Sequence, residues 1–159
     1  MRCNMRRKDR EITDIAAIDA FISREKIMRV GFCDDGEVYI VPVNYGYVHR
    51  GDECGFYFHG AMAGRKFELA KCSPKVGFEI DGGYRLIDGD KACDHSAQFQ
   101  SVIGTGQLSL VGDADEKEAA LNCLMKHQTG RSDWSYDSGM LAHTAVFRIK
   151  VTQMTCKAK

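Results

Sequence analysis

The sequence predicts a mostly β protein in which six or seven antiparallel strands form a small barrel with added helices. Short runs rich in β-branched and aromatic residues, bounded by turn signals, outnumber the segments with helical spacing. These runs do not alternate regularly with helices, as the strands of a parallel sheet would. With 159 residues, 44% of them hydrophobic and 28% charged, the chain is expected to form one soluble domain over residues 1–159.

Three helices are expected from capping residues and helical spacing. In the first, Ile15, Ile18 and Ile22 share one face and form an apolar stripe. The three helices are expected from residue 13 or 14 to about 23, from 65 to a stop at Ser73-Pro74, and from 113 or 115 to about 127.

The extended segments are bounded by turns and loops. Asp34-Asp35-Gly36 is a hairpin turn signal. Pro42 interrupts the strand that follows, and it marks an edge or a bulge because proline cannot donate to a ladder. The segments 82–96 and 129–139 lack periodicity and are expected to be long irregular loops. The strands are expected at residues 27–33, 38–44, 45–48, 55–58, 76–80, 99–111 and 142–154.

Charge and cysteine content exclude several classes of function. The formal net charge is zero and the isoelectric point is about 6.9, so no general attraction to nucleic acid or membrane is expected. No apolar stretch approaches the roughly 18 residues of a membrane span, and no signal peptide is visible. Seven scattered cysteines without a CxxC pair indicate reduced thiols, so a cytoplasmic location is expected.

No metal site is expected. Cys93, Asp94 and His95 are adjacent candidate ligands, but three neighbours on a regular strand cannot all face one ion. No second cluster has zinc-like spacing.

The segment 55–74 carries the strongest functional signal. It runs from a strand through a turn of small residues, from Gly60 to Gly64, into a short helix that opens on Arg65 and Lys66. Cations are locally unfavourable at a helix start, which already carries partial positive charge. A bound phosphate would balance them, because backbone donors and both cations converge on it.

Four groups of residues carry a family resemblance: 5–12, 41–47, 57–76 with its Gly64-Arg65-Lys66 triplet, and 92–94 followed by 101–106. In this order they resemble the split-barrel flavoproteins related to pyridoxamine 5′-phosphate oxidase. The branch of 5-nitroimidazole resistance (nitroimidazole reductase) proteins is the most similar. The resemblance extends over nearly the whole chain and implies an antiparallel split β-barrel.

The resemblance also implies a cofactor and an activity. FMN would bind noncovalently with its phosphate on Arg65 and Lys66, in a homodimer that holds two flavins at the subunit interface. The protein would be an FMN-dependent oxidoreductase that takes electrons from a reduced nicotinamide or another donor. The acceptor would be a small molecule, with nitroaromatics as one candidate class. The branch often has an aromatic–Arg pair where this chain has Phe99-Gln100, a change that affects an anion contact or the substrate pocket.

The candidate site residues come from the residues and the resemblance together. His59 is the candidate catalytic residue, because the resemblance places it near the flavin and imidazole titrates near neutral pH. A strand broken by proline leaves backbone groups free for the polar edge of a flavin ring. Small residues allow the backbone to approach the ligand closely. Ser101 and Val102 would contact the flavin from their own strand pair or from the second subunit. The expected cofactor-binding residues are Pro42, Val43, Asn44, His59, Gly60, Ala61, Gly64, Arg65, Lys66, Ser101 and Val102.

Other functions remain open at this point. One is a flavin-binding protein without turnover, such as a sensor, and another is the same fold with haem or a deazaflavin. A structural protein without cofactor would leave the two cations unexplained. Trp134 and Tyr136, in the second expected loop, would cover a planar ligand or pack at a dimer contact.

Overall fold

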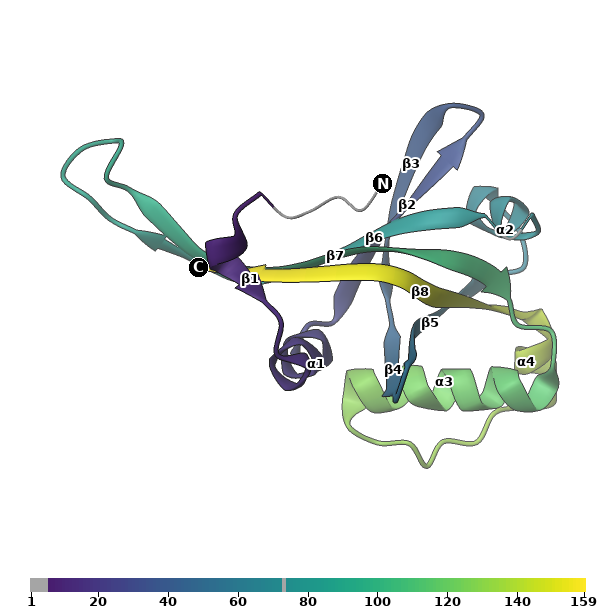
Figure 1. The fold of residues 1–159 in the computed structure, drawn as a ribbon. Coiled ribbons are helices and arrows are strands. Elements are labelled where there is room, and N and C mark those ends of the chain that lie inside the picture. The colour runs from purple at the N-terminus through teal and green to yellow at the C-terminus, as the bar shows by residue number, and fades with distance from the viewer. Residues whose placement is uncertain (1–5, 73) are drawn as a thin grey trace.

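The computed structural model describes residues 6–72 and 74–159, which form one strongly curved antiparallel sheet with helices around it (Figure 1). Seven strands follow the order β3-β2-β6-β7-β8-β5-β4, and the short β1 pairs with β8. The mostly antiparallel fold class expected from the sequence is therefore confirmed. The strands are β1 (Glu11–Ile12), β2 (Ile27–Asp34), β3 (Glu37–Asn44), β4 (Gly46–Arg50), β5 (Glu53–Ala61), β6 (Lys75–Ile87), β7 (Ser96–Leu110) and β8 (Thr144–Ala158).

The sheet does not close on itself. β3 lies beside β5, yet no hydrogen-bonded ladder joins the two strands. This gap makes the architecture a split barrel, and we call the line between β3 and β5 the split. Phenylalanines fill the barrel interior, with the rings of Phe58 and Phe147 stacked at 4.8 Å.

The helices lie at the ends and side of the barrel (Figure 1). α3 packs along β4 and β5, and its first turn is capped by Asp113, which accepts a hydrogen bond from the Glu116 amide at 2.9 Å. None of the helices in the described ranges is long and apolar enough to cross a membrane. The helices are the 3₁₀ turn η1 (Lys8–Arg10) and α1 (Ile15–Arg24), α2 (Arg65–Ala70), α3 (Ala114–Thr129) and α4 (Ser138–His143).

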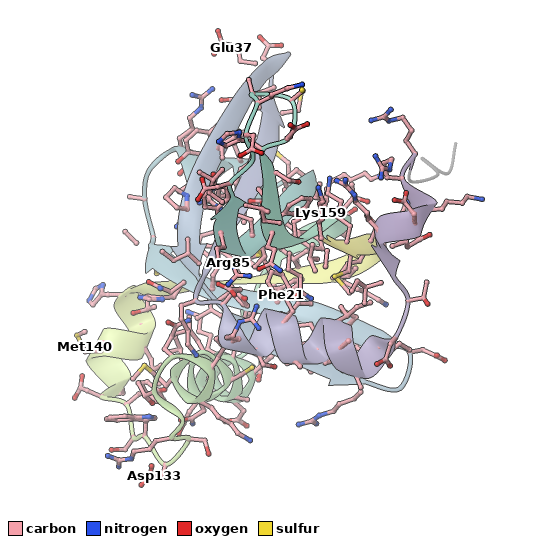
Figure 2. All side chains as sticks on the ribbon, turned by 90° about the vertical axis from the view of Figure 1, so that its left-hand side faces the viewer. Phe21, Glu37, Arg85, Asp133, Met140 and Lys159 are labelled. Atoms are coloured by element: carbon pink, nitrogen blue, oxygen red, sulfur yellow. The ribbon has the colours of Figure 1, made fainter. Side chains whose placement is uncertain are left out.

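The predicted hairpin turn between β2 and β3 is confirmed. Asp35 and Gly36 both have positive φ, 51° and 86°, as a two-residue type I′ turn requires. Figure 2 shows Glu37 at the tip of this hairpin. The register continues without a shift past Pro42, so Pro42 marks the edge of the sheet and not a bulge.

The first helix is capped as expected, and two residues of its expected apolar stripe, Ile18 and Ile22, pack in the core. Asp14 accepts a hydrogen bond from the Ala16 amide at 3.2 Å. Phe21 and Ile22 are buried, whereas Ile15 is 59% exposed. The expected stripe was wrong at Ile15 because the helix contacts the barrel through its C-terminal half.

The long loop expected at 82–96 was wrong. β6 continues to Ile87 and β7 begins at Ser96, and the two form a paired arm that projects from the barrel (Figure 1). A register shift between Gly82 and Arg85 lets the ribbon bend. Gly82, Gly83 and the polar residues that follow Ile87 hid the strand signal, because a ribbon that projects into solvent needs no apolar alternation.

Smaller boundary errors concern the turns around β5 and β8. Gly60 and Ala61 belong to β5, so the expected small-residue turn is shorter. The helix α4 was not expected; the Asp137 carboxylate caps it by accepting from the amides of Gly139 and Met140 at 2.8 and 3.1 Å. The helix stop expected at Ser73-Pro74 falls partly outside the described residues, as does Met5, the first residue of the N-terminal motif.

Candidate functional site

The split brings together the two segments that carry most of the predicted site residues. Pro42, Val43 and Asn44 end β3 on one side, and His59, Gly60 and Ala61 end β5 on the other. Gly64 then precedes α2. Because β3 and β5 contact each other without a ladder, both strands border the same gap.

The free edge of β3 offers backbone groups to this gap. In a two-residue hairpin the residues flanking the turn form a hydrogen-bonded pair, here Asp34 and Glu37, and such pairs alternate along the ladder. Pro42 and Asn44 therefore direct their backbone polar groups away from β2. The Val43 side chain is buried in the core, and the Asn44 amide donates to the Lys26 carbonyl at 3.1 Å.

Arg65 already has anionic partners within the chain. Its Nε donates to the Asp34 carboxylate at 2.6 Å, and its Nη2 lies 3.6 Å from the Glu37 carboxylate. The guanidinium also sits 4.8 Å from the centroid of the Tyr39 ring. The charge imbalance expected at Arg65 is therefore wrong for the chain by itself, because the β2–β3 hairpin bends back over the start of α2.

Lys66 differs from its neighbour. Among the described residues no carboxylate pairs with it. Its ammonium is half-buried over two rings, 5.5 Å from the centroid of Phe58 and 5.2 Å from that of Phe147. Burial lowers the pKa of Lys66 below its usual value. The expected imbalance of charge thus resides at Lys66.

Gly60 makes room for this ammonium. A Cβ atom at Gly60 would lie 2.9 Å from Lys66 Nζ and 3.5 Å from the Phe147 ring. The absence of a side chain at Gly60 therefore determines where the cation rests.

His59 lies on the outer face of β5, opposite Val146 of β8. Its side chain is exposed in the single chain. Partial burial and the positive charge of Lys66 both lower the pKa of the His59 imidazole. A neutral imidazole can donate one hydrogen bond and accept another.

Ser101 and Val102 are not at the split of their own chain. Val102 is fully buried in the core, and Ser101 faces the opposite side of β7. β2 and β6 separate β7 from β3. Contact from the same strand pair is thus not observed, and contact from a second subunit stays a prediction.

Three partners of Arg65 were missed by sequence reasoning: Asp34, Glu37 and Tyr39. The acidic turn was a visible signal, since Asp34, Asp35 and Glu37 cluster around the hairpin. The fold is needed to show that these acidic residues pair with Arg65, because the hairpin and α2 are far apart in the sequence.

A family model described as pyridoxamine 5′-phosphate oxidase matches residues 14–158, which include both sides of the split. The chain belongs to this family. No curated protein matches the chain.

Solved structures agree with the family assignment. A crystal structure from Bacteroides thetaiotaomicron, described as a candidate 5-nitroimidazole antibiotic resistance protein, is 28% identical, with a TM-score of 0.79 over 93% of this chain and 86% of that one. The flavocytochrome Anf3 from Azotobacter vinelandii is 19% identical, with a TM-score of 0.79 over 98% and 72%. An FAD- and haem-binding protein from Mycobacterium smegmatis is 14% identical, with a TM-score of 0.80 over 94% and 73%. The last two similarities concern the fold.

Proposed function

We propose that this protein binds FMN at the split and acts as an oxidoreductase on a small acceptor. The observation that carries the proposal is Lys66, a half-buried cation without a carboxylate partner in the described residues, whose ammonium lies beside Gly60 of β5, the strand that borders the split opposite β3. Flavin is the cofactor named for several structures of the same fold, including an FAD-binding protein from Mycobacterium smegmatis.

The residues at the split fit the parts of FMN. Lys66 is suited to bind the phosphate as a point charge. The planar guanidinium of Arg65 adds further hydrogen bonds to the phosphate if it binds phosphate and Asp34 together. The helix α2 has only six residues and lacks a side-chain cap, so its backbone adds less than the two cations. The free edge of β3 at Pro42 and Asn44 suits the polar edge of the flavin ring.

A bound flavin would supply the redox chemistry, accepting a hydride from a reduced nicotinamide and passing electrons to the acceptor. The residues of the chain would hold the flavin, orient it and shield it from water. Lys66 keeps positive charge beside the β5 end of the split, and Phe58 and Phe147 exclude water from the barrel side. Neutral His59 is the group suited to donate a hydrogen bond to a reducible substrate or to accept a proton from a bound group.

A homodimer is part of this proposal. Exposed apolar side chains gather on the outer surface of β2, β3 and β7: Ile27, Val38, Ile40 and Ile103, which are 50–76% exposed and which we call the outer apolar face. The small residues Gly31 of β2 and Gly77 of β6 lie between β3 and β7 on the same surface and leave it without side chains there. A second copy would cover this face and bring its Ser101 towards the first copy's split.

Spectroscopy of the purified protein tests the proposal. Bound oxidised flavin absorbs at about 375 and 450 nm, and anaerobic NADH or NADPH is expected to bleach the upper band. Reoxidation by a nitroaromatic or another small acceptor would complete the turnover. Colourless protein that added FMN does not reconstitute would contradict flavin binding, whereas flavin that is bound but never reduced would leave a carrier or sensor.

The same spectrum distinguishes haem, which the FAD- and haem-binding protein of the same fold from Mycobacterium smegmatis binds. Haem would give a strong band at about 400 nm. A haem band without flavin bands would replace the proposed cofactor while leaving the fold assignment intact.

A further inference from the structure

A cavity lies away from the split. It is a cleft of about 500 Å³ between the β4–β5 hairpin and the helix α3, and Ser132 and Arg148 also line it. This volume falls within the range of small-molecule sites. None of the residues expected to bind flavin lines it.

Small side chains on α3 create the cleft. At Gly46 the strand β4 approaches the helix so closely that a Cβ atom would lie 2.6 Å from the Leu124 amide nitrogen. Beside this contact, Ala119, Ala120 and Cys123 face the hairpin and leave the space between helix and strands unfilled. The cavity is therefore built by backbone contact on one side and short side chains on the other.

The charges around the cleft are mostly positive. Arg50, Lys126 and Arg148 line it, against one carboxylate, Glu53. Arg148 is engaged by Glu53 and by Glu116, the latter at 3.4 Å. For Arg50 and Lys126, no carboxylate partner occurs within residues 6–72 and 74–159.

These two cations line the cleft from two different elements, Arg50 from β4 of the hairpin and Lys126 from α3. Burial raises the pKa of the Cys123 thiol, which also lines the cleft, while the charges of Lys126 and Arg50 act in the opposite direction. An anion bound in the cleft would meet positive charge from two elements.

Neutral donors complete the lining. The Tyr57 hydroxyl makes no hydrogen bond to another described residue, and partial burial raises its pKa, so it remains a donor. Asn122 uses its oxygen to accept from Tyr136 at 3.4 Å, which leaves the amide hydrogens for a ligand. The apolar surface beside them comes from the Tyr57 ring and the two alanines.

We propose that the cleft between the β4–β5 hairpin and α3 binds a small organic anion, a carboxylate or a phosphate ester with a compact apolar body. Its charge lies between Arg50 and Lys126, and its body lies on Tyr57, Ala119 and Ala120. Tyr57 and His59 share one face of β5, about 7 Å apart along the strand. The cleft is thus a separate site next to the proposed flavin site, and its occupancy does not depend on flavin.

Binding of three matched probes tests the site: benzoate, phenyl phosphate and the neutral benzyl alcohol. Titrations of the purified protein, with and without added FMN, are followed by calorimetry and by amide shifts in nuclear magnetic resonance spectra. At least one of the two anions is expected to bind about tenfold more tightly than the alcohol, or more. The stronger anion then identifies carboxylate or phosphate as the ligand head. The shifted amides are expected in Tyr47–Tyr57 and Ala119–Lys126.

Two variants sharpen this test. The double variant Arg50→Gln/Lys126→Gln is expected to weaken anion binding by roughly tenfold or more, since two charge-assisted contacts are lost. The control Lys75→Gln/Lys91→Gln removes the same charge from exposed positions elsewhere and is expected to leave binding unchanged. Ala119→Leu fills the cleft with a larger side chain, and leucine, like alanine, favours the helix. This variant is expected to abolish binding of all probes.

Several outcomes would overturn the proposal. They are equal binding of the alcohol, an unchanged affinity in the cation variant, shifts confined to other residues, and no saturable binding of any probe at about 10 mM. Because the flavin spectrum is measured separately, failure here and failure of the flavin proposal are distinguishable.

Discussion

At the scale of single residues, the site depends on how two adjacent cations are compensated. Arg65 is paired with Asp34 and Glu37, whereas Lys66 rests on aromatic rings beside Gly60. Exposed ion pairs such as that of Arg65 contribute little to stability, so a phosphate can compete for this guanidinium. The uncompensated charge of Lys66 is the stronger determinant.

Gly60 gives a direct test of this arrangement. In Gly60→Ala the new methyl group would lie 2.9 Å from Lys66 Nζ, so the flexible lysine is expected to move and the fold to remain. We expect FMN affinity to fall about threefold or more, with little change in melting temperature. Fluorescence titration and thermal unfolding measure the two effects. Gly112→Ala is the control, because a Cβ there meets nothing within 4 Å; equal affinities in the two variants would contradict the role given to Gly60.

The sequence indicated two neighbouring cations at the start of α2 but not the ion pairs of Arg65. The small-residue turn and the Arg65-Lys66 pair are local signals, and they indicated a helix start with excess charge. Which acid approaches Arg65 depends on how a hairpin thirty residues earlier folds back, and no local pattern encodes that. Ser101 was predicted from resemblance, and in one chain two strands, β2 and β6, lie between its strand β7 and β3.

At the scale of elements, α3 holds the β4–β5 hairpin by direct backbone contact at Gly46. In Gly46→Ala the Cβ would lie 2.6–2.8 Å from main-chain atoms of Cys123 and Leu124, which cannot rotate away. We expect the free energy of unfolding to fall by roughly 1–3 kcal/mol, measured by urea denaturation. A loss as small as that of Gly112→Ala would show that the helix adjusts without cost.

The end of α3 also makes stability depend on pH. His127 Nε2 donates to the Glu25 carbonyl at 2.7 Å, and its ring lies 4.5 Å from that of Tyr45. Burial lowers the pKa of His127, and Lys26 adds to this, although the bond to Glu25 opposes it. The unfolded chain therefore binds more protons below about pH 6.5, and stability falls as the pH drops.

His127→Gln keeps a donor for Glu25 but removes the titrating group. We expect a smaller loss of unfolding free energy between about pH 7 and pH 5 than in the unsubstituted protein. The residual slope includes His59, whose pKa is also lowered. Exposed His143, at the end of α4, supplies the control His143→Gln; an unchanged slope in His127→Gln together with a changed slope in the control would contradict this assignment.

Element boundaries were predicted well where capping and turn residues mark them. Asp14, Asp113 and the Asp35-Gly36 turn stand where their side chains or φ angles require. The arm of β6 and β7 was missed because a ribbon that projects into solvent needs no apolar alternation. The helix α4 was missed because only six residues form it.

At the scale of the whole molecule, the outer apolar face is the surface that a second copy would cover. Ile40 and Ile103 are 61% and 53% exposed in the single chain. We expect Ile40→Lys/Ile103→Lys to be monomeric in analytical ultracentrifugation and to bind FMN more weakly. Met140→Lys, at an exposed position on α4, is the control and should remain dimeric. If the variant with lysines on the outer apolar face still dimerises, the interface lies elsewhere on the molecule.

The central claim is that Lys66 holds the phosphate of a bound flavin, and the contribution of that phosphate can be measured by comparing FMN with riboflavin, which lacks it. For the unsubstituted protein we predict FMN binding at least about tenfold tighter than riboflavin, since one charge-assisted contact contributes roughly 1.5–3 kcal/mol. In Lys66→Met this preference should nearly disappear, whereas Lys71→Met, which removes an exposed lysine next to the same helix, should retain it. Equal affinities for the two flavins in the unsubstituted protein, or a full FMN preference in Lys66→Met, would contradict the account.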